Sequence, residues 1–294
     1  MRHRNKRRPL AGAATIALLG LIVVYAGLSI YKAVDYTTTP PNPLPTRSAL
    51  TEQRIPHQGF AFRSSAGDQV TLRGTWAPNP KSHRAIILVH GRCENRMSHV
   101  DLAITLRNGG FNILLFDLRG HGESDRTPST YGLQERWDVL GAVEFVKRRG
   151  IAPEHIGVVG WSLGGTSAIL AMSQSPDIAA VVSDSAYANG DPLLARNMLR
   201  PGLKLAHNIV RDIDIDKIRV DEAMAEIGER PVFLIHGAAD QAVPASQAEL
   251  LQQAGSAGMT ETWIVPGAGH IGAYAMHPDE YASRVIAFFD EALG

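Results

Sequence analysis

Short apolar runs alternate with segments of helical spacing along most of this 294-residue chain, and this alternation limits its possible folds more than any other feature. The run at 69–76 alternates in polarity, which predicts a half-buried strand. The other runs are continuously apolar, which predicts strands covered on both faces, at 85–89, 111–116, 155–159, 178–182, 232–235 and 262–265. Helices are expected at 97–108, 133–149, 163–173, 246–253 and 278–293. This order predicts an α/β fold, with a mostly parallel sheet and helices on both faces.

The alternation is interrupted once, between residues 187 and 229. This segment has no strand-like run, but it has a helical stretch rich in Leu and Met that is flanked by Pro192 and Pro201. Because the insertion lies between two predicted core strands, we expect it to form a small helical cap. The cap would lie above the carboxyl ends of the strands, where open α/β sheets bind ligands.

The N-terminal region carries an uncharged, apolar run of 22 residues at 10–31. A helix of that length spans about 33 Å, which is enough to cross the hydrocarbon layer of a membrane. We therefore predict a single transmembrane signal anchor. The tail at 1–9 is basic and should stay in the cytoplasm, which would leave the remaining chain extracytoplasmic. Two alternatives stay open: a cleaved signal peptide, whose apolar stretch is usually about 7–15 residues long, and an unusual buried helix.

The residues that follow the apolar run, at 32–54, are expected to form a proline-rich linker. Four prolines lie between residues 37 and 48 and favour an extended chain over packed structure. We interpret the linker as a stalk that holds a globular domain, at 55–294, away from the bilayer.

Charge and cysteine content exclude some classes of partner and site. Lys plus Arg and Asp plus Glu are both 29, but five of the basic residues lie in the first eight positions. The remaining chain is therefore mildly acidic, and it has no basic run of the kind that a nucleic-acid-binding protein needs. No nucleic-acid partner is expected. Cys93 is the only cysteine, so an intramolecular disulfide is impossible.

The most specific motif is a G-x-S-x-G sequence, which runs from Gly160 through Ser162 to Gly164. It lies between a predicted strand and a predicted helix. A nucleophilic serine needs such a sharp strand-to-helix turn to expose its hydroxyl, and small flanking residues let backbone segments approach closely. The N-terminus of the helix would offer the N–H of Leu163 to a developing oxyanion. The motif therefore predicts Ser162 as a nucleophile.

An acid and a base for this serine are found further along the chain. A serine hydroxyl is a weak nucleophile unless a base takes its proton and an acid orients the base. Asp240 follows the predicted strand at 232–235, and His270 follows the one at 262–265. Both fall in loops at strand carboxyl ends, at the same edge of the sheet as Ser162, in the order Ser, Asp, His. We predict a catalytic triad of these three residues.

These motifs resemble the signatures of the α/β-hydrolase family. GWSLGG, HGAADQAVP and GAGH are similar to its nucleophile, acid and base segments. The early HGR and FDLRGHGES segments are similar to its oxyanion loop and the loop that follows. The similarity covers about residues 60–292, and it is strongest to the branch of serine aminopeptidases, acyl-ester hydrolases and Bem-type membrane-anchored hydrolases. The resemblance implies that the backbone N–H of Arg92 joins that of Leu163 in an oxyanion hole.

Other residues compete for these roles. Asp184 directly follows a predicted strand and is the nearest rival of Asp240, although a structural role is favoured for it. Cys93 neighbours the oxyanion loop but lacks a nucleophile elbow. Three further histidines are alternatives to His270 as the base, and we expect them to organise loops instead: His90, His121 and His236.

From these residues we expect a serine hydrolase that cleaves a carboxylic ester of a small-molecule acyl substrate. A peptidase or a thioesterase would use the same triad, and a peptidase should also carry an acidic group that reads an amine, for which Glu123 and Asp125 are candidates. A catalytically silent, membrane-tethered interaction protein is a further alternative. Because H-E-x-x-H and paired-cysteine motifs are absent from the sequence, and no G-x-G-x-x-G fingerprint follows the first predicted strand, no metal and no cofactor are expected. The oligomeric state stays open.

Overall fold

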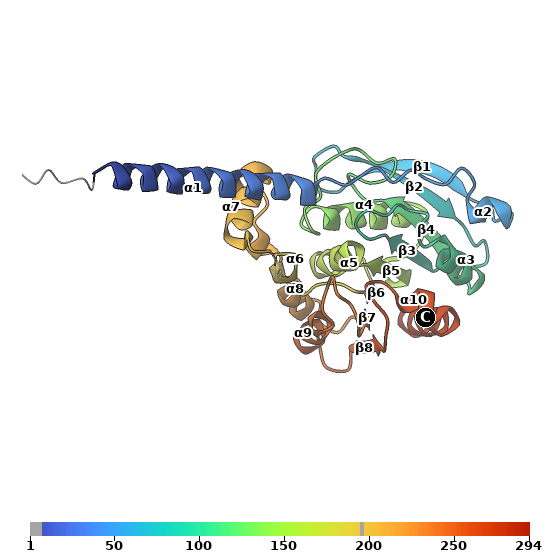
Figure 1. Ribbon diagram of the computed structural model, residues 1–294. Coiled ribbons are helices and arrows are strands. Elements are labelled where there is room, and N and C mark those ends of the chain that lie inside the picture. The colour runs from blue at the N-terminus through green and yellow to red at the C-terminus, as the bar shows by residue number, and fades with distance from the viewer. Residues whose placement is uncertain (1–7, 195–196) are drawn as a thin grey trace, which may run out of the picture.

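The computed structural model describes residues 8–194 and 197–294, and it has a long N-terminal helix followed by alternating strands and helices (Figure 1). The strands are β1 (Gln58–Arg63), β2 (Thr71–Ala77), β3 (Ala85–Val89), β4 (Asn112–Asp117), β5 (Ile156–Trp161), β6 (Ala180–Asp184), β7 (Val232–Gly237) and β8 (Thr260–Val265). The helices are α1 (Arg8–Thr37), α2 (Ala49–Glu52), α3 (Val100–Asn108), α4 (Glu135–Arg148), η1 (Pro153–His155), α5 (Leu163–Gln174), α6 (Asp191–Leu194), α7 (Arg200–Arg211), η2 (Ile215–Lys217), α8 (Val220–Glu226), α9 (Ser246–Ala254), α10 (Ala273–Met276) and α11 (Pro278–Leu293).

Within the described residues, the strands form one eight-stranded sheet in the order β1-β2-β4-β3-β5-β6-β7-β8. All neighbours from β4 to β8 are parallel, whereas β2 pairs antiparallel with both β1 and β4. The predicted mostly parallel sheet is confirmed. Because the carboxyl ends of parallel strands meet at one edge, the loops after β3, β5, β7 and β8 all leave the sheet on the same side.

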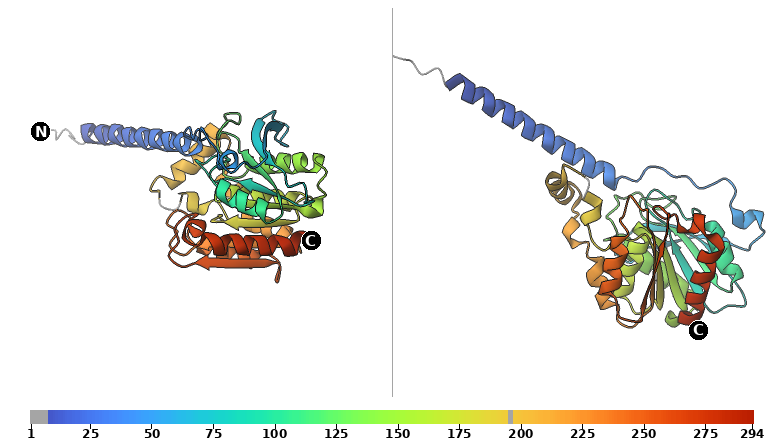
Figure 2. Two further views of the ribbon diagram at one scale, coloured as in Figure 1. Left: turned by 90° about the vertical axis from the view of Figure 1, so that its right-hand side faces the viewer. Right: turned by 60° about the horizontal axis from the view of Figure 1, so that its bottom comes forward.

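Two hydrophobic clusters cover the two faces of the sheet, with α4, α5, α8 and α9 on one face and α3 and α11 on the other (Figure 2). Strand β3 shows how its residues divide between them: Ile87 and Val89 belong to the first cluster, and Ile86 and Leu88 to the second. Strands β3 to β7 are buried along their whole length. This double cover explains why their sequences are continuously apolar.

Two strands differ from the sequence expectation. Strand β1 was not predicted, because its residues are mostly exposed at the edge of the sheet and only Phe62 is buried. Strand β8 was expected to be covered on both faces, but it is the opposite edge strand, and within it only Val265 is buried. An edge strand has one neighbour and less cover, so its pattern resembles that of a loop more than that of a core strand.

The N-terminal helix α1 is longer than the apolar run that predicted it. It continues past Lys32 and Asp35, whose side chains form an ion pair within the helix, and it ends at Thr37, shortly before Pro40. Its part from Ala14 to Thr37 is long and apolar enough to cross a membrane, although an N-terminal signal sequence would have the same properties. Most of the basic tail, including Arg2 and Arg7, lies outside the described residues.

The segment after α1 differs from the expected stalk, because it lies against the domain. The side chain of Asn42 donates a hydrogen bond to the carbonyl oxygen of Cys93 at 2.8 Å. Asn95 in turn donates to the carbonyl oxygens of Asn42 and Pro43. The side chain of Leu50, in α2, is buried in the cluster that contains α3. The side chains of Asn42, Asn95 and Leu50 therefore hold the proline-rich segment against the domain, whereas its composition alone predicted an extended stalk.

The insertion at 187–229 is helical, with α6, α7, η2 and α8. It does not form one separate cap. Helix α8 packs against α5 and α9 and so belongs to the layer that covers the sheet, whereas α7 packs against α1 (Figure 1). The part of the insertion nearest the carboxyl edge of the sheet is the loop and short helix between Tyr187 and Leu194.

Candidate active site

Ser162 occupies a sharp turn between β5 and α5. Its backbone φ angle is +50°, in a region that non-glycine residues rarely adopt, and the turn is held by a 2.7 Å hydrogen bond from its N–H to the carbonyl oxygen of Asp184. Side chains are excluded on both sides of the turn. A Cβ atom on Gly160 would collide with the backbone of Gly164, and a Cβ atom on Gly164 would collide with the carbonyl oxygens of Val89 and His90.

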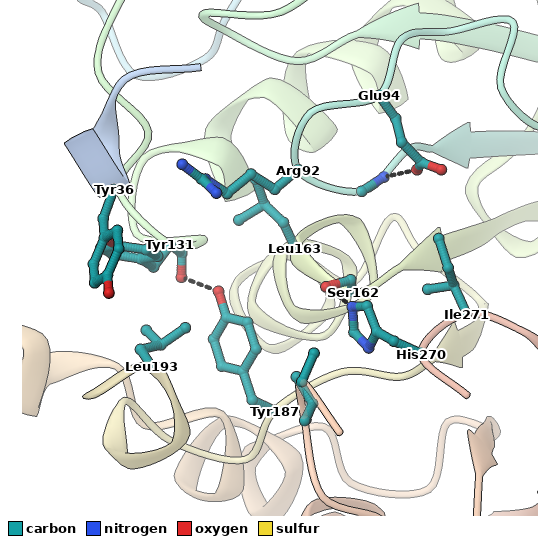
Figure 3. Close-up of a pocket in the computed structure, with 13 residues that line it drawn as sticks. Tyr36, Arg92, Glu94, Tyr131, Ser162, Leu163, Tyr187, Leu193, His270 and Ile271 are labelled. Atoms are coloured by element: carbon teal, nitrogen blue, oxygen red, sulfur yellow. Dashed lines mark hydrogen bonds between the residues drawn. The ribbon is translucent and has the colours of Figure 1, made fainter. Parts of the chain in front are cut away.

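The side chains of Ser162, His270 and Asp240 are connected by hydrogen bonds, of which Figure 3 shows the one between Ser162 and His270. The Nε2 atom of His270 lies 2.9 Å from the hydroxyl oxygen of Ser162, and its Nδ1 atom lies 2.7 Å from Oδ2 of Asp240. The structure therefore brings the three predicted residues together from loops after β5, β7 and β8. With Nδ1–H donated to the carboxylate, Nε2 is free to accept the proton of the serine.

Asp240 is held as a carboxylate by several donors. Its Oδ1 accepts the backbone N–H groups of Ala242 and Val243, each at 2.8 Å, and its Oδ2 faces both His270 and His236. Burial opposes ionisation of this group, but the hydrogen bonds from the two histidines and from Val243 outweigh burial and hold the pKa of Asp240 below its usual range. Asp240 is therefore ionised throughout the pH range in which His270 can act as a base.

The backbone groups expected to form an oxyanion hole lie beside the serine. Leu163 is the first residue of α5, so its N–H has no carbonyl partner within the helix. Arg92 lies in the loop after β3, and both residues line the same cavity as Ser162 (Figure 3). The two N–H groups belong to the start of α5 and to the loop after β3. These two segments can approach closely because Gly164 has no Cβ atom.

Glu94 positions this loop, and sequence reasoning missed it. Its Oε2 accepts the N–H of Gly91 at 2.6 Å (Figure 3). The same oxygen lies 3.1 Å from Nε2 of His99, whose ring stacks on that of Trp161 with centroids 3.7 Å apart. Burial opposes ionisation of Glu94, but the contacts with His99 and Gly91 lower its pKa. The sequence signal that could have identified Glu94 is its position as an acidic residue four positions after His90, in the segment that resembles an oxyanion loop.

The site opens into a cavity of about 370 Å³, within the size range of small-molecule sites. Three tyrosines form much of its wall, and the hydroxyl of Tyr187 donates to the carbonyl oxygen of Tyr131 at 2.9 Å. The third, Tyr36, comes from the last turn of α1 (Figure 3). Aliphatic side chains complete the lining: Leu193, Val243 and Ile271. The wall is mostly apolar, and the guanidinium of Arg92 points away from the serine, toward the end of α1, where it lies 3.5 Å from the carbonyl oxygens of Asp35 and Thr38 (Figure 3).

The rival residues have other partners. Asp184 is fully buried, accepts hydrogen bonds from Ser185 and Tyr281, and has a pKa raised by burial to about 6. The rings of His90 and His121 lie next to each other in the core. Nε2 of His90 accepts the N–H of Leu118, and Nε2 of His121 accepts the N–H of Cys93. Burial lowers the pKa of His90 to about 4. These residues shape the loops around the site, as does His236, whose Nε2 donates to the carbonyl oxygen of Val243 at 2.9 Å.

The two acidic candidates for reading an amine do not line the cavity. Glu123 is paired with Arg96, and the exposed carboxylate of Asp125 accepts the N–H of Thr71 at 2.7 Å. The structure favours the alternative reading of both residues as loop charges, because the loop after β4 turns these side chains toward structural partners. In residues 8–194 and 197–294, no cluster of His, Cys, Asp and Glu has an arrangement that could hold a metal ion.

Comparisons with known proteins agree with the fold. A family model described as alpha/beta hydrolase fold matches residues 84–226. The chain is 31% identical over 207 residues to the uncharacterized protein Rv2307c of Mycobacterium tuberculosis, covering 69% of each protein. It is 28% identical over 247 residues to the uncharacterized protein YfhR of Escherichia coli, covering 81% of this chain and 83% of that one. Among solved structures, the esterase Pf2001 of Pyrococcus furiosus is similar with a TM-score of 0.72 and 26% identity, covering 87% of this chain and 100% of that one.

Proposed function

Because this chain belongs to the α/β-hydrolase family, we propose that it is a serine hydrolase that cleaves carboxylic esters through an acyl-enzyme intermediate. The observation that carries the proposal is the continuous set of hydrogen bonds from Ser162 through His270 to Asp240. The similarity to an esterase, which extends over the whole of that protein, supports ester cleavage. The mostly apolar cavity wall also favours an acyl group over a sugar or a charged peptide.

In this mechanism, His270 takes the proton of Ser162 as the serine oxygen attacks the acyl carbonyl carbon. The tetrahedral oxyanion is stabilised by the N–H groups of Arg92 and Leu163. The ester bond then breaks, and the leaving alcohol takes the proton from His270. Water repeats the sequence on the acyl-enzyme and releases the carboxylic acid. Asp240 keeps the imidazole in the required tautomer and stabilises its charge.

The proposal is tested with the purified full chain and p-nitrophenyl butyrate. Ser162→Ala is expected to lower kcat by about 10⁴- to 10⁶-fold, because the nucleophile is lost. Ser173→Ala is the matched control, since that serine lies at the far end of α5 and its hydroxyl donates only within the helix. A fluorophosphonate probe should label the wild type at Ser162 and leave the Ser162→Ala variant unlabelled. An unchanged rate in Ser162→Ala would refute the assignment.

The acyl bond is tested by a panel that compares esters, a thioester and aminoacyl amides. A peptidase needs a carboxylate that is available to bind an amine, and Glu94, the acidic side chain that lines the cavity, already accepts hydrogen bonds from Gly91 and His99. We therefore expect kcat/KM to be highest for esters. Faster cleavage of an aminoacyl amide would replace the esterase assignment by a peptidase.

We further propose that α1 is an uncleaved signal anchor, with the basic tail in the cytoplasm and the catalytic domain outside it. The length and apolar character of Ala14–Thr37 support a membrane span. The excess of basic residues before the span, against the single Lys32 near its C-terminal end, supports this orientation. The contacts of α1 with the domain also favour its retention, because they would be lost on cleavage.

A further inference from the structure

The last turn of α1 is part of the substrate cavity. Tyr36 lines the same cavity as Ser162. Its hydroxyl accepts a hydrogen bond from Asn197 at 3.2 Å, and the next residue, Thr37, is fully buried. The hydroxyl of Thr37 accepts from Arg211 of α7, and its carbonyl oxygen accepts the N–H of Ser129. The end of α1 is thereby fixed to the insertion and to the core, so it does not act only as a tether.

Helix α7 packs closely against α1 at a point inside the apolar span. The N–H of Gly202 donates to the hydroxyl of Tyr25 at 3.0 Å, and a Cβ atom at Gly202 would collide with Ser29 and with the ring of Tyr25. Tyr25 lies about 18 Å along the helix before Thr37. If α1 crosses a membrane, α7 must therefore lie at the depth of the half of the bilayer nearest the domain (Figure 2).

The outer side of α7 suits that environment. Leu205 and Ile209 are four residues apart, so they lie on one face of the helix, and they are 62% and 71% exposed. Met198, just before α7, is almost fully exposed as well. An apolar groove lies between this segment and α1, lined by Leu21, Ile22, Val24, Tyr25, Leu28 and Leu199. Exposed apolar surface of this kind, continuous with a membrane-spanning helix, is expected to be covered by lipid.

The charges on α7 are compatible with this placement. Arg200 is paired with Asp191, and Lys204 is paired with Asp216. The third cation of the helix, Arg211, donates to the hydroxyl of Thr37 at 3.0 Å, so each cation has a partner within the protein. Long basic side chains also extend toward the polar interface while their apolar stems stay in the hydrocarbon.

We propose that the face formed by α7 and the adjacent half of α1 is embedded in the membrane leaflet next to the domain, and that the cavity draws an acyl ester of a membrane lipid from that leaflet. The substrate class rests on the proposed esterase function. The link between face and cavity is Tyr36, which belongs to the helix that spans the membrane and also to the wall beside Ser162. The acyl group would pass from the lipid oxygen to the oxygen of Ser162, the lipid alcohol would leave with the proton carried by His270, and water would release the fatty acid.

Insertion is tested by tryptophan fluorescence of the full chain in phosphatidylcholine vesicles whose acyl chains are brominated. Ile209→Trp is expected to gain a component that the brominated lipid quenches strongly. Leu250→Trp is the matched control, because Leu250 is a 40% exposed leucine on α9, outside the proposed face. Equal quenching of the two added tryptophans would overturn the embedded face.

The substrate class is tested by two substrates: dioleoylglycerol in phosphatidylcholine vesicles, followed by fatty acid release, and p-nitrophenyl butyrate in solution. The double variant Leu205→Glu, Ile209→Glu should lower fatty acid release about 10-fold more than it lowers the rate on the soluble ester. Leu250→Glu should change both rates by less than about 2-fold.

The outcomes separate this proposal from the proposed function. Equal loss on both substrates would mean that α7 has only a structural role, and it would overturn the proposal. A wild type that cleaves the soluble ester but neither the diacylglycerol nor the phosphatidylcholine would overturn the lipid substrate while leaving the esterase intact. A wild type that cleaves neither substrate would overturn both.

Discussion

At the scale of single residues, the carboxylate of Asp240 determines which nitrogen of His270 carries the proton. Asp240 accepts two backbone N–H groups on one oxygen and faces the imidazole with the other. These contacts fix the position of the Asp240 side chain. Replacing its carboxylate by an amide should therefore change the tautomer of His270 and the charge of the site more than the positions of the side chains. The triad can therefore be tested through its acid as well as through its nucleophile.

We expect Asp240→Asn to lower kcat by about 10³- to 10⁴-fold with a small change in KM. The amide would donate to Nδ1 and force the proton onto Nε2, which could then no longer accept the proton of Ser162. The measurement is steady-state hydrolysis of p-nitrophenyl butyrate, with Asp177→Asn as a control at a surface carboxylate that pairs with Lys147. A variant that changes KM alone would contradict this role.

A buried carboxyl next to the site should make stability depend on pH. Burial raises the pKa of Asp184 to about 6, above its value in the unfolded chain. The native state therefore binds the proton more strongly than the unfolded state, and stability falls as the pH rises through this range. Between pH 5 and pH 8, this group alone should reduce the free energy of unfolding by about 1 kcal/mol.

The variant Asp184→Asn should lack this part of the pH dependence, because its amide is uncharged throughout. The measurement is the midpoint of thermal unfolding in detergent at pH 5 and at pH 8, for wild type and variant. Both should unfold closer to the same temperature at pH 5, and the variant should be the more stable at pH 8. If the unfolding midpoints of wild type and variant differ by the same amount at both pH values, Asp184 does not titrate in this range.

At the scale of elements, the position of Ser162 depends on how closely α5 approaches β3. This approach is possible because Gly164 has no side chain next to the carbonyl oxygens of Val89 and His90. Gly164→Ala should push α5 outward, reduce stability by about 1–3 kcal/mol and lower kcat, because Ser162 and Leu163 would both move. The control Gly59→Ala lies on β1, where a Cβ atom meets nothing closer than 4.0 Å. Wild-type kcat in Gly164→Ala would show that the elbow tolerates a wider separation.

The elements that sequence patterns predicted best are those with strong local signals. Strand β3 begins and ends where its apolar run does, and β4, β5 and β7 differ from their runs by one or two residues at an end. The triad was also accessible, because each member follows a predicted strand and parallel strands bring such positions together. Edge strand β1 carried no comparable signal, since Phe60 and Phe62 are its only large apolar residues and pack against Phe145 of α4.

Contacts between distant segments were not accessible from the sequence. Nothing in the local pattern of Tyr36 or Gly202 indicates that α1 reaches the cavity or that α7 packs on α1. Composition described 32–54 as extended, yet single hydrogen bonds such as that from Asn42 to the carbonyl oxygen of Cys93 hold it on the domain. Such contacts depend on the whole fold, because they join surfaces that exist only after the sheet and its helices have formed.

At the scale of the whole molecule, the orientation of α1 decides which compartment the cavity faces. Ala14–Thr37 is preceded by a basic tail, whereas near its other end it carries the single Lys32 and is followed by a mildly acidic remainder. An alkaline phosphatase reporter fused after Gly294 should therefore be active, because this reporter needs an extracytoplasmic location to form its disulfides. A green fluorescent reporter at the same point should be dark when the chain is exported in an unfolded state.

If the charge of the tail determines the proposed orientation, a change of that charge should alter it. Replacing Arg2, Arg4, Lys6, Arg7 and Arg8 by Gln leaves α1 and every described contact of the domain in place but removes the basic excess. We expect phosphatase activity per molecule to fall severalfold as part of the population inserts in reverse, while replacing only the four arginines, by Lys, leaves it unaltered. If the Gln variant stays fully active, the charge of the tail does not orient the chain. Since the contacts of α1 join it only to its own domain, they give no preference for either side of the membrane, and the basic tail is the feature of the sequence that does.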